Sequence, residues 1–283
     1  MQGRIAVVTG ASGGIGMLSA LELARSGFHV IATMRNLSKR TTLDRFAAEQ
    51  GFTQRIEVRQ LDVTDFPSLK PAMEAIVHDF GRIDILLNNA GFALGGFADD
   101  VALAELREQL ETNFFGHVEI TKAAMPTLRK QQSGHVIMVS SISGVCAQAG
   151  VSSYSASKWA LEGWSEALRL ECQPLGIKVV LIEPGAFKTD VWDTNVHIAK
   201  AAYSESSPNT ARVRKFAEYA KTKIVKHDPV QVAQLIARVA KDANPRLRYV
   251  VGTDAHIQKW LKKVLPWKWY ERLLVHELGL DAK

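Results

Sequence analysis

Short, mostly apolar runs return at regular intervals along the chain, and segments of a different pattern separate them. The runs cover residues 4–9, 28–33, 56–60, 83–88, 135–140, 178–183 and 248–251. The segments between them carry apolar residues at helical spacing and cover residues 14–25, 41–50, 67–80, 103–129, 151–172 and 229–242. Nearly continuous apolar strands that alternate with helices are typical of a parallel sheet with both faces covered. Right-handed crossovers then predict an α/β fold, a doubly wound parallel sheet of about seven strands in a single domain over residues 1–283.

Two segments depart from this alternation. Residues 186–228 are polar and helix-prone, and they follow the sixth strand at the edge of the sheet where doubly wound folds bind ligands. We interpret them as a helical substrate-covering segment, with a plain surface excursion as the alternative. Residues 256–283 predict a C-terminal helical tail in which Trp260, Trp267 and Trp269 stand among lysines.

Composition narrows the class of protein without identifying it. The 283 residues are 47% hydrophobic and 23% charged, which is ordinary for a globular domain with a large core. With two cysteines and no secretory signal ahead of the first strand, we expect reduced thiols and a cytoplasmic location. No apolar stretch reaches the ~18 residues of a membrane span. The histidines form no cluster with ligand spacing, so no metal site is expected.

The net charge of +6 indicates an anionic partner, because basic proteins can bind nucleic acid, an anionic membrane or an anionic ligand. The basic residues are densest at residues 35–40, 212–226 and 259–268. We assign the first patch to a phosphorylated cofactor and the other two to solvated helix faces, and we expect no nucleic-acid partner. A basic, tryptophan-rich tail could also make peripheral contact with an anionic membrane. We favour instead tryptophans that pack on the body or line a contact between subunits.

A glycine-rich turn joins the first strand to the first helix. It contains Gly10, Gly14 and Gly16, and among them stand Ser12, Gly13 and Ile15. Glycines let backbone N–H groups approach a pyrophosphate, and the N-terminus of the helix adds partial positive charge. The Gly-x-x-x-Gly-x-Gly spacing is a variant of the dinucleotide fingerprint of Rossmann folds, so we predict that these residues bind a cofactor.

The end of the second strand indicates which dinucleotide is bound. Folds that bind NAD place an acidic residue here for the ribose hydroxyls, but this chain has Arg35, followed by Lys39 and Arg40. A guanidinium group suits a ribose 2′-phosphate, which predicts NADP(H). Asp62 and Val63 follow the third strand, where an acidic side chain could hold the adenine amino group.

The fourth strand ends in Asn88, and Asn89, Ala90 and Gly91 follow it. Small residues at this edge let the backbone lie against a cofactor, although a plain turn cap would also use asparagine and glycine. We therefore place Asn89, Ala90 and Gly91 among the predicted cofactor-binding residues.

Tyr154 and Lys158 stand four residues apart, so a helix places both on one face. A free phenol has a pKa of about 10, and a nearby ammonium group favours the phenolate and lowers that pKa. Tyr154 could then give a proton to a carbonyl oxygen or take one from an alcohol. Ser141 follows the fifth strand, and its hydroxyl could hydrogen-bond the same substrate oxygen.

Together with Asn113 and Pro184-Gly185, these motifs resemble the short-chain dehydrogenase/reductase family in their order and approximate spacing, over about residues 3–252. The resemblance implies an oxidoreductase with a catalytic tetrad of Asn113, Ser141, Tyr154 and Lys158. It implies that Lys158 also binds the nicotinamide ribose and that Asn113 holds a water molecule. The residues implied to border the nicotinamide are Pro184, Gly185, Phe187 and Thr189, and Phe187 departs from the smaller or β-branched residue that many relatives carry.

The resemblance also implies a homo-oligomer, a dimer or tetramer built on the helices that contain Asn113 and Tyr154. A weaker similarity to the 17β-hydroxysteroid and retinol dehydrogenase branch, carried by residues 32–36 and the tail, implies a bulky apolar carbonyl or alcohol substrate. The stretches 92–97 and 145–151 fit a roomy apolar pocket. Two alternatives stay open: a 3-oxoacyl-thioester reductase with the same tetrad, and a non-catalytic NADP(H)-sensing protein.

Overall fold

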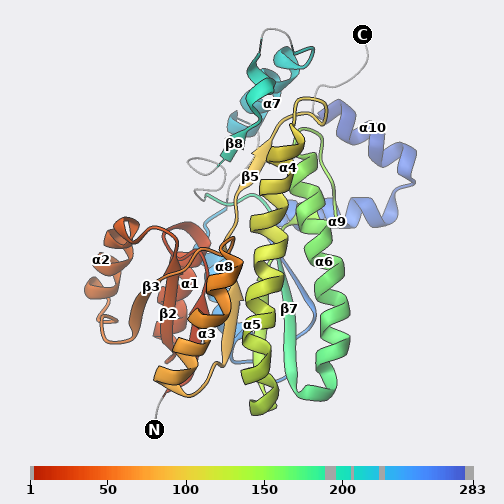
Figure 1. The fold of residues 1–283 in the computed structure, drawn as a ribbon. Coiled ribbons are helices and arrows are strands. Elements are labelled where there is room, and N and C mark those ends of the chain that lie inside the picture. The colour runs from red at the N-terminus through yellow and green to blue at the C-terminus, as the bar shows by residue number, and fades with distance from the viewer. Residues whose placement is uncertain (1–2, 189–195, 205–206, 223–226, 278–283) are drawn as a thin grey trace.

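The computed structural model describes residues 3–188, 196–204, 207–222 and 227–277. A parallel sheet forms its centre, with helices packed around it (Figure 1). The sheet has seven strands in the order β3-β2-β1-β4-β6-β7-β9. The strands are β1 (Ile5–Val8), β2 (His29–Met34), β3 (Ile56–Gln60), β4 (Ile85–Asn88), β6 (Gly134–Val139), β7 (Ile177–Pro184) and β9 (Arg248–Val251). Each predicted apolar run supplies one of these strands, so the predicted doubly wound α/β fold is confirmed.

Helices cover both faces of the sheet. On one face pack α1 (Gly14–Arg25), α2 (Thr41–Glu49) and α8 (Val230–Val239). On the other pack α3 (Phe66–Phe80), α5 (Gly116–Gln131) and α6 (Ser152–Cys172). Strand order reverses between β1 and β4, and doubly wound sheets bind ligands in the crevice at that point.

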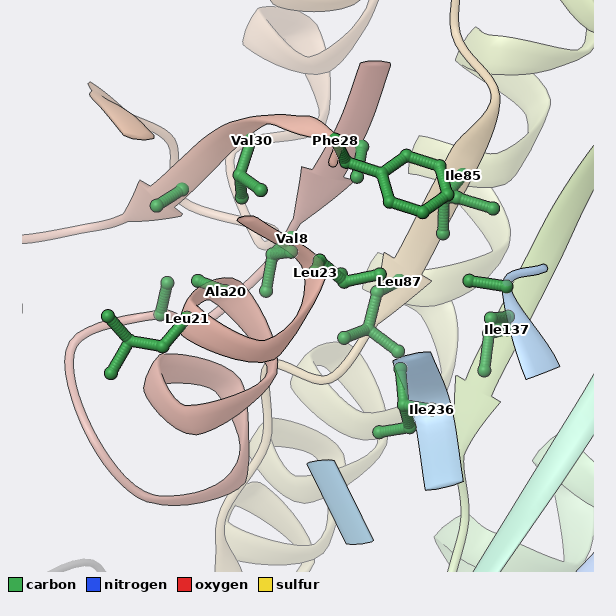
Figure 2. Close-up of a cluster of buried hydrophobic side chains, with 14 of the residues drawn as sticks. Val8, Ala20, Leu21, Leu23, Phe28, Val30, Ile85, Leu87, Ile137 and Ile236 are labelled. Carbon is green, nitrogen blue, oxygen red and sulfur yellow. The ribbon is translucent and has the colours of Figure 1, made fainter. Parts of the chain in front are cut away.

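Alternate residues of β1 point to opposite faces, and each face has its own core. Val8 lies in one core with Leu23 of α1, Leu87 of β4 and Ile236 of α8 (Figure 2). Val7 belongs to the core on the opposite face. Burial on both faces explains why the strands read as continuous apolar runs rather than as alternating patterns.

The predicted helix over residues 103–129 is interrupted. It consists of α4 (Leu103–Leu110), a π-helical turn over Glu111–Phe115, and α5. The turn directs Asn113 into the interior, where its side chain hydrogen-bonds the backbone of Phe92. Single π turns inside α-helices often mark functional positions.

The chain leaves the central fold after Lys188 and re-enters it at His227, and these two residues lie side by side. The backbone N–H of Lys188 donates to the carbonyl of His227, and the N–H of His227 donates to the carbonyl of Ala186, both at 2.9 Å. Within the excursion, β8 (Val196–Ile198) pairs with β5 (Ala93–Gly95), and α7 (Thr210–Thr222) lies beyond them (Figure 1). The two short strands were not predicted. They tie the excursion to the loop that follows β4.

Two helices form the end of the described chain. They are α9 (Thr253–Val264) and α10 (Trp267–Glu277), with Leu265 and Pro266 between them. The predicted helical tail is thus confirmed up to residue 277, and residues 278–283 lie outside the described part. None of the helices that the structure describes is long and apolar enough to cross a membrane.

Candidate active site

A cavity of about 680 Å³ lies at the carboxyl edge of the sheet, over the reversal between β1 and β4. Turns that are far apart in the sequence line it. Nearly all of the predicted site residues are among its lining: Gly10, Ser12, Gly13, Gly14, Ile15, Arg35, Asp62, Val63, Asn89, Ala90, Gly91, Ser141, Tyr154, Lys158, Pro184, Gly185 and Phe187. Thr189 lies outside the described residues. One continuous cavity therefore joins the predicted cofactor residues to Ser141 and Tyr154.

Gly16 and Asn113 support this lining from behind rather than forming part of it. A Cβ atom on Gly16 would lie 2.3 Å from the carbonyl oxygen of Gly10 and 2.4 Å from Nδ2 of Asn89. Asn113 is fully buried, and its amide donates to the carbonyl of Phe92 at 3.0 Å and to Oγ of Ser157 at 3.2 Å. Both residues thus fix the positions of neighbours that reach the cavity.

The turn after β1 is open to an anion. Gly10 has a φ of +68°, and a Cβ there would lie 2.8 Å from Cα of Ala90, so only glycine fits without strain. No side chain caps α1 at Gly13, and its first turn contains no acidic residue. The first N–H groups of a helix have no partner within the helix and attract anions. This turn therefore suits a phosphate group.

Gly16→Ala tests the packing of this turn. Overpacking of a tight contact costs about 1–3 kcal/mol, and we expect a loss of unfolding free energy of that size. Gly163→Ala is the matched control, because Gly163 is exposed in α6 and a Cβ there meets nothing within 4 Å. Alanine favours a helix over glycine by up to about 1 kcal/mol, so the control should be neutral or stabilising. Urea unfolding measures both, and equal stabilities would contradict the packing.

Thr9 joins the turns that follow β1 and β4. Its Oγ1 accepts hydrogen bonds from the N–H groups of Asn89 at 2.9 Å and Ala90 at 3.0 Å. The Asn89 amide returns bonds to the carbonyls of Thr9 at 3.0 Å and Gly10 at 3.2 Å. These bonds hold the two walls of the crevice at a fixed distance.

Basic residues stand where β2 ends. Arg35 is exposed and lines the cavity with Lys39. Arg40 does not line it, because its guanidinium pairs with Asp44 at 2.6 Å on the first turn of α2. On the facing turn, Asp62 accepts hydrogen bonds from the backbone and hydroxyl of Thr64 at 2.9 and 2.8 Å.

Tyr154 and Lys158 project from α6 toward Ser141. Both side chains are buried, and Tyr154 hydrogen-bonds the Ser141 hydroxyl. Nζ of Lys158 donates to the carbonyl of Val139 at 2.9 Å and lies 5.7 Å from the centre of the Tyr154 ring. The ammonium group is therefore directed at the end of β6 rather than at the phenol oxygen.

Burial governs the pKa values of this pair. It raises the pKa of Tyr154, and the Ser141 hydrogen bond opposes that rise. This direction is the reverse of the lowering that the Tyr154–Lys158 spacing predicts, because burial of the phenol outweighs its hydrogen bond to Ser141. Burial also lowers the pKa of Lys158 to about 8, and the charge of Glu162 opposes that fall.

The comparisons with known proteins identify the family. Residues 4–198 match the family described as short chain dehydrogenase. This chain belongs to the short-chain dehydrogenase/reductase family. The match ends at β8, so the helices from α7 onward lie outside it.

Several members of the family are similar over most of the chain. The chain is 40% identical over 280 residues to the uncharacterized oxidoreductase YusZ of Bacillus subtilis, covering 98% of this chain and 99% of that protein. It is 35% identical over 252 residues to 3-ketodihydrosphingosine reductase of Bacteroides thetaiotaomicron, with 89% of each protein covered. It is 33% identical over 258 residues to retinol dehydrogenase 8 of Bos taurus, covering 88% of this chain and 82% of that protein.

Solved structures of the family have the same fold. A short-chain dehydrogenase from Streptomyces avermitilis matches with a TM-score of 0.82 at 31% identity, covering 100% of this chain and 99% of that one. A metagenomic short-chain oxidoreductase in complex with NADP matches with a TM-score of 0.68 at 25% identity, covering 88% of this chain and 95% of that one.

Sequence analysis missed an ionic cluster that forms around the buried carboxylates of Glu162 and Glu183. Arg248 of β9 lies 2.9 Å from the carboxylate of Glu162 and 3.4 Å from that of Glu183. Lys259 of α9 lies 2.6 Å from the other oxygen of Glu183, which is fully buried. The signal in the sequence was a glutamate inside an apolar strand, directly before Pro184. The cluster ties α6, β7 and β9 to the tail.

His117 was missed as well. It is fully buried on α5, where burial lowers its pKa to about 3, and the positive charge of Lys158 adds to that lowering. The neutral ring therefore donates from Nε2 to the carbonyl of Ala90 at 2.7 Å. This hydrogen bond fixes the turn after β4 against α5.

Proposed function

We propose that this chain is an NADP(H)-dependent oxidoreductase that interconverts a carbonyl and an alcohol on a bulky apolar substrate. The observation that carries the proposal is the single cavity that places hydrogen-bonded Ser141 and Tyr154 beside the turn after β1 and the cation of Arg35. Two hydroxyls alone would serve many reactions. Their place in a crevice that suits a dinucleotide is the reason for proposing hydride chemistry.

The cavity fits a phosphorylated dinucleotide. The open N-terminus of α1 and the close backbone approach at Gly10 suit the pyrophosphate, and Arg35 and Lys39 suit a ribose 2′-phosphate. The remaining residues that would hold the cofactor are Ser12, Asp62, Val63, Asn89, Ala90, Gly91, Lys158, Pro184, Gly185 and Phe187. When bound, NADPH supplies the hydride that reduces a carbonyl carbon. The complex of the metagenomic relative with NADP supports this choice.

The chain's own hydroxyls act on the substrate oxygen. Tyr154 gives its proton to that oxygen as the carbonyl is reduced, and takes a proton from an alcohol in the reverse direction. Ser141 hydrogen-bonds the same oxygen and fixes its position between the two hydroxyls. Lys158 binds the ribose of the cofactor. Asn113 fixes the backbone of Phe92, which lines the same cavity.

The negative charge of Glu162 raises the pKa of Lys158, and removal of this charge is expected to shift the pH dependence of kcat. Glu162→Gln removes the negative charge that raises the pKa of Lys158, so that pKa falls below about 8. The limb of the kcat profile that Lys158 governs should move to lower pH. Glu166→Gln is the matched control, because Glu166 also bonds Arg248 but is more exposed. An identical shift in both variants, or none in Glu162→Gln, would contradict this role.

An apolar substrate is supported by the rest of the lining. The ring centroids of Phe92 and His197 are 4.7 Å apart, and both rings line the cavity together with Phe187. Of the two stretches expected to form an apolar pocket, residues 92–97 contribute Phe92 and residues 145–151 contribute nothing to this lining. His197 of β8 lines the cavity, which supports the interpretation of residues 186–228 as a substrate-covering segment. Retinol and 3-ketodihydrosphingosine, for which two relatives are named, both carry a long hydrocarbon portion.

A substrate panel tests the proposal. NADPH oxidation is followed by absorbance with long-chain ketones, retinal, ketosteroids, simple aldehydes and an acetoacetyl thioester, with NADH in parallel. We expect turnover of an apolar ketone or aldehyde, with NADPH preferred. Turnover of the thioester alone would instead identify a 3-oxoacyl-thioester reductase. Tight NADPH binding without any turnover would favour the sensing protein.

A further inference from the structure

Helix α9 turns its polar side toward the protein. Its body-facing positions are Ala255, Lys259 and Lys262, and the two lysines act as anchors. Lys259 pairs with buried Glu183, and Lys262 donates to the carbonyl of Val145 and lies 4.6 Å from the centre of the Trp159 ring. From α10, Tyr270 is the residue that enters the body.

The apolar side of the tail is therefore left outward. Trp260, Trp267 and Trp269 are 61%, 62% and 66% exposed. Ile257 and Val264 stand on the same face of α9 as Trp260 and are also exposed. The expectation that these tryptophans pack on the body is wrong, because Ala255, Lys259, Lys262 and Tyr270 occupy the body-facing positions. The alternative expectation, a contact between subunits, stays a prediction. We call the outward set of Ile257, Trp260, Val264, Trp267 and Trp269 the tail face. Large exposed apolar patches mark sites of interaction.

The charges around the tail face favour one kind of partner. Lys263, Lys268 and Arg272 are exposed on the same two helices, beside the acidic Glu271 and Glu277. Tryptophan and lysine together are typical of segments at the boundary between lipid headgroups and acyl chains. The three cations outnumber the two carboxylates, and an anionic bilayer attracts this excess of positive charge.

We infer that the tail face is a peripheral binding surface for anionic lipid bilayers. Helices α9 and α10 lie in the headgroup region, Trp260, Trp267 and Trp269 enter the acyl boundary, and Lys263, Lys268 and Arg272 contact phosphate groups. Helix α9 also packs on the loop after Ser141, where Ala255 contacts Ile142 and Cys146. The bound surface thus adjoins a wall of the active site. Lipid binding does not require catalysis, so this inference and the proposed function fail or hold separately.

Vesicle flotation with the full chain tests the inference. The probes are vesicles of phosphatidylcholine mixed with phosphatidylserine and vesicles of phosphatidylcholine alone. We expect the protein to float with the mixed vesicles, to be released at high salt, and to show a blue shift of tryptophan emission on binding. Failure of the wild-type protein to float with mixed vesicles would overturn the inference.

Variants locate the surface. The variant Lys263→Gln/Lys268→Gln is expected to bind mixed vesicles about 30-fold more weakly. Each cation near an anionic surface contributes about 1 kcal/mol to binding, and the variant lacks two of them. Trp260→Ser/Trp267→Ser/Trp269→Ser should abolish flotation. The matched controls are Lys70→Gln/Lys130→Gln, both exposed on other helices, and Leu170→Ser, which is 74% exposed on α6. Thermal unfolding verifies that each variant folds.

Two outcomes would contradict the location. One is flotation of the tryptophan variant at the wild-type level. The other is a change of oligomeric state in that variant, measured by sedimentation, with unchanged lipid binding. The second result would assign the tail face to another copy of the chain.

Discussion

Tyr154→Phe is expected to lower kcat by at least about 10²–10⁴-fold and to leave the Kd of NADPH nearly unchanged. The substitution removes one hydroxyl and keeps the buried ring, so the packing of α6 is preserved. Ser141 remains in place, but its hydroxyl is a weaker acid than the phenol of Tyr154 and does not replace it as the proton donor. Kinetics of NADPH oxidation give kcat, and NADPH fluorescence titration gives Kd.

Tyr203→Phe is the control for this substitution. Tyr203 is 50% exposed and does not line the cavity, so loss of its hydroxyl should leave kcat unchanged. Near-normal turnover in Tyr154→Phe would remove Tyr154 from the mechanism. A loss of NADPH affinity in Tyr154→Phe as large as its loss of kcat would instead indicate that Tyr154 has a structural role.

Arg35→Asp is expected to raise the Kd of NADPH at least tenfold, to judge from the ~1.5–3 kcal/mol of a hydrogen bond to a charged group. The substitution removes the cation at the end of β2 and adds an anion, which repels a 2′-phosphate. NADH lacks that phosphate, and a carboxylate at this position can accept hydrogen bonds from ribose hydroxyls. NADH binding should therefore change little or improve. Parallel titrations with both cofactors measure the ratio.

Arg40→Asp is the control for position rather than charge. Arg40 carries the same charge five residues later, but it pairs with Asp44 and does not line the cavity. We expect its cofactor ratio to stay close to that of the wild-type chain. A similar ratio in Arg35→Asp and the wild type would refute the assignment of Arg35 to the 2′-phosphate.

The parts of the fold that were predicted from the sequence are those with strong local patterns. Burial on both faces makes each strand a continuous apolar run, and Gly10 and Gly16 stand where close backbone contacts exclude a side chain. The strands β5 and β8 have three residues each, and they pair across about a hundred residues of chain. No local pattern encodes such a pair.

The site shows the same division. Tyr154, Lys158 and Ser141 were predicted from their spacing together with the resemblance to the family. The direction of the Lys158 ammonium depends on the carbonyl of Val139, which only the fold brings within reach. The partners of Glu183 come from β9 and α9, and its role was therefore hidden. The exposure of Trp260 likewise depends on which face of α9 the body takes.

Deuterium transfer tests the central claim most directly. NADPH labelled at C4 of the nicotinamide, in both stereochemical forms, is incubated with the best carbonyl substrate of the panel, and the alcohol product is examined by mass spectrometry and NMR. We predict that deuterium from one of the two forms appears on the carbinol carbon, that NADPH is consumed in equal amount, and that Tyr154→Phe suppresses the product. An alcohol without deuterium from either form, or consumption of NADPH with no alcohol formed, would contradict hydride transfer at this site.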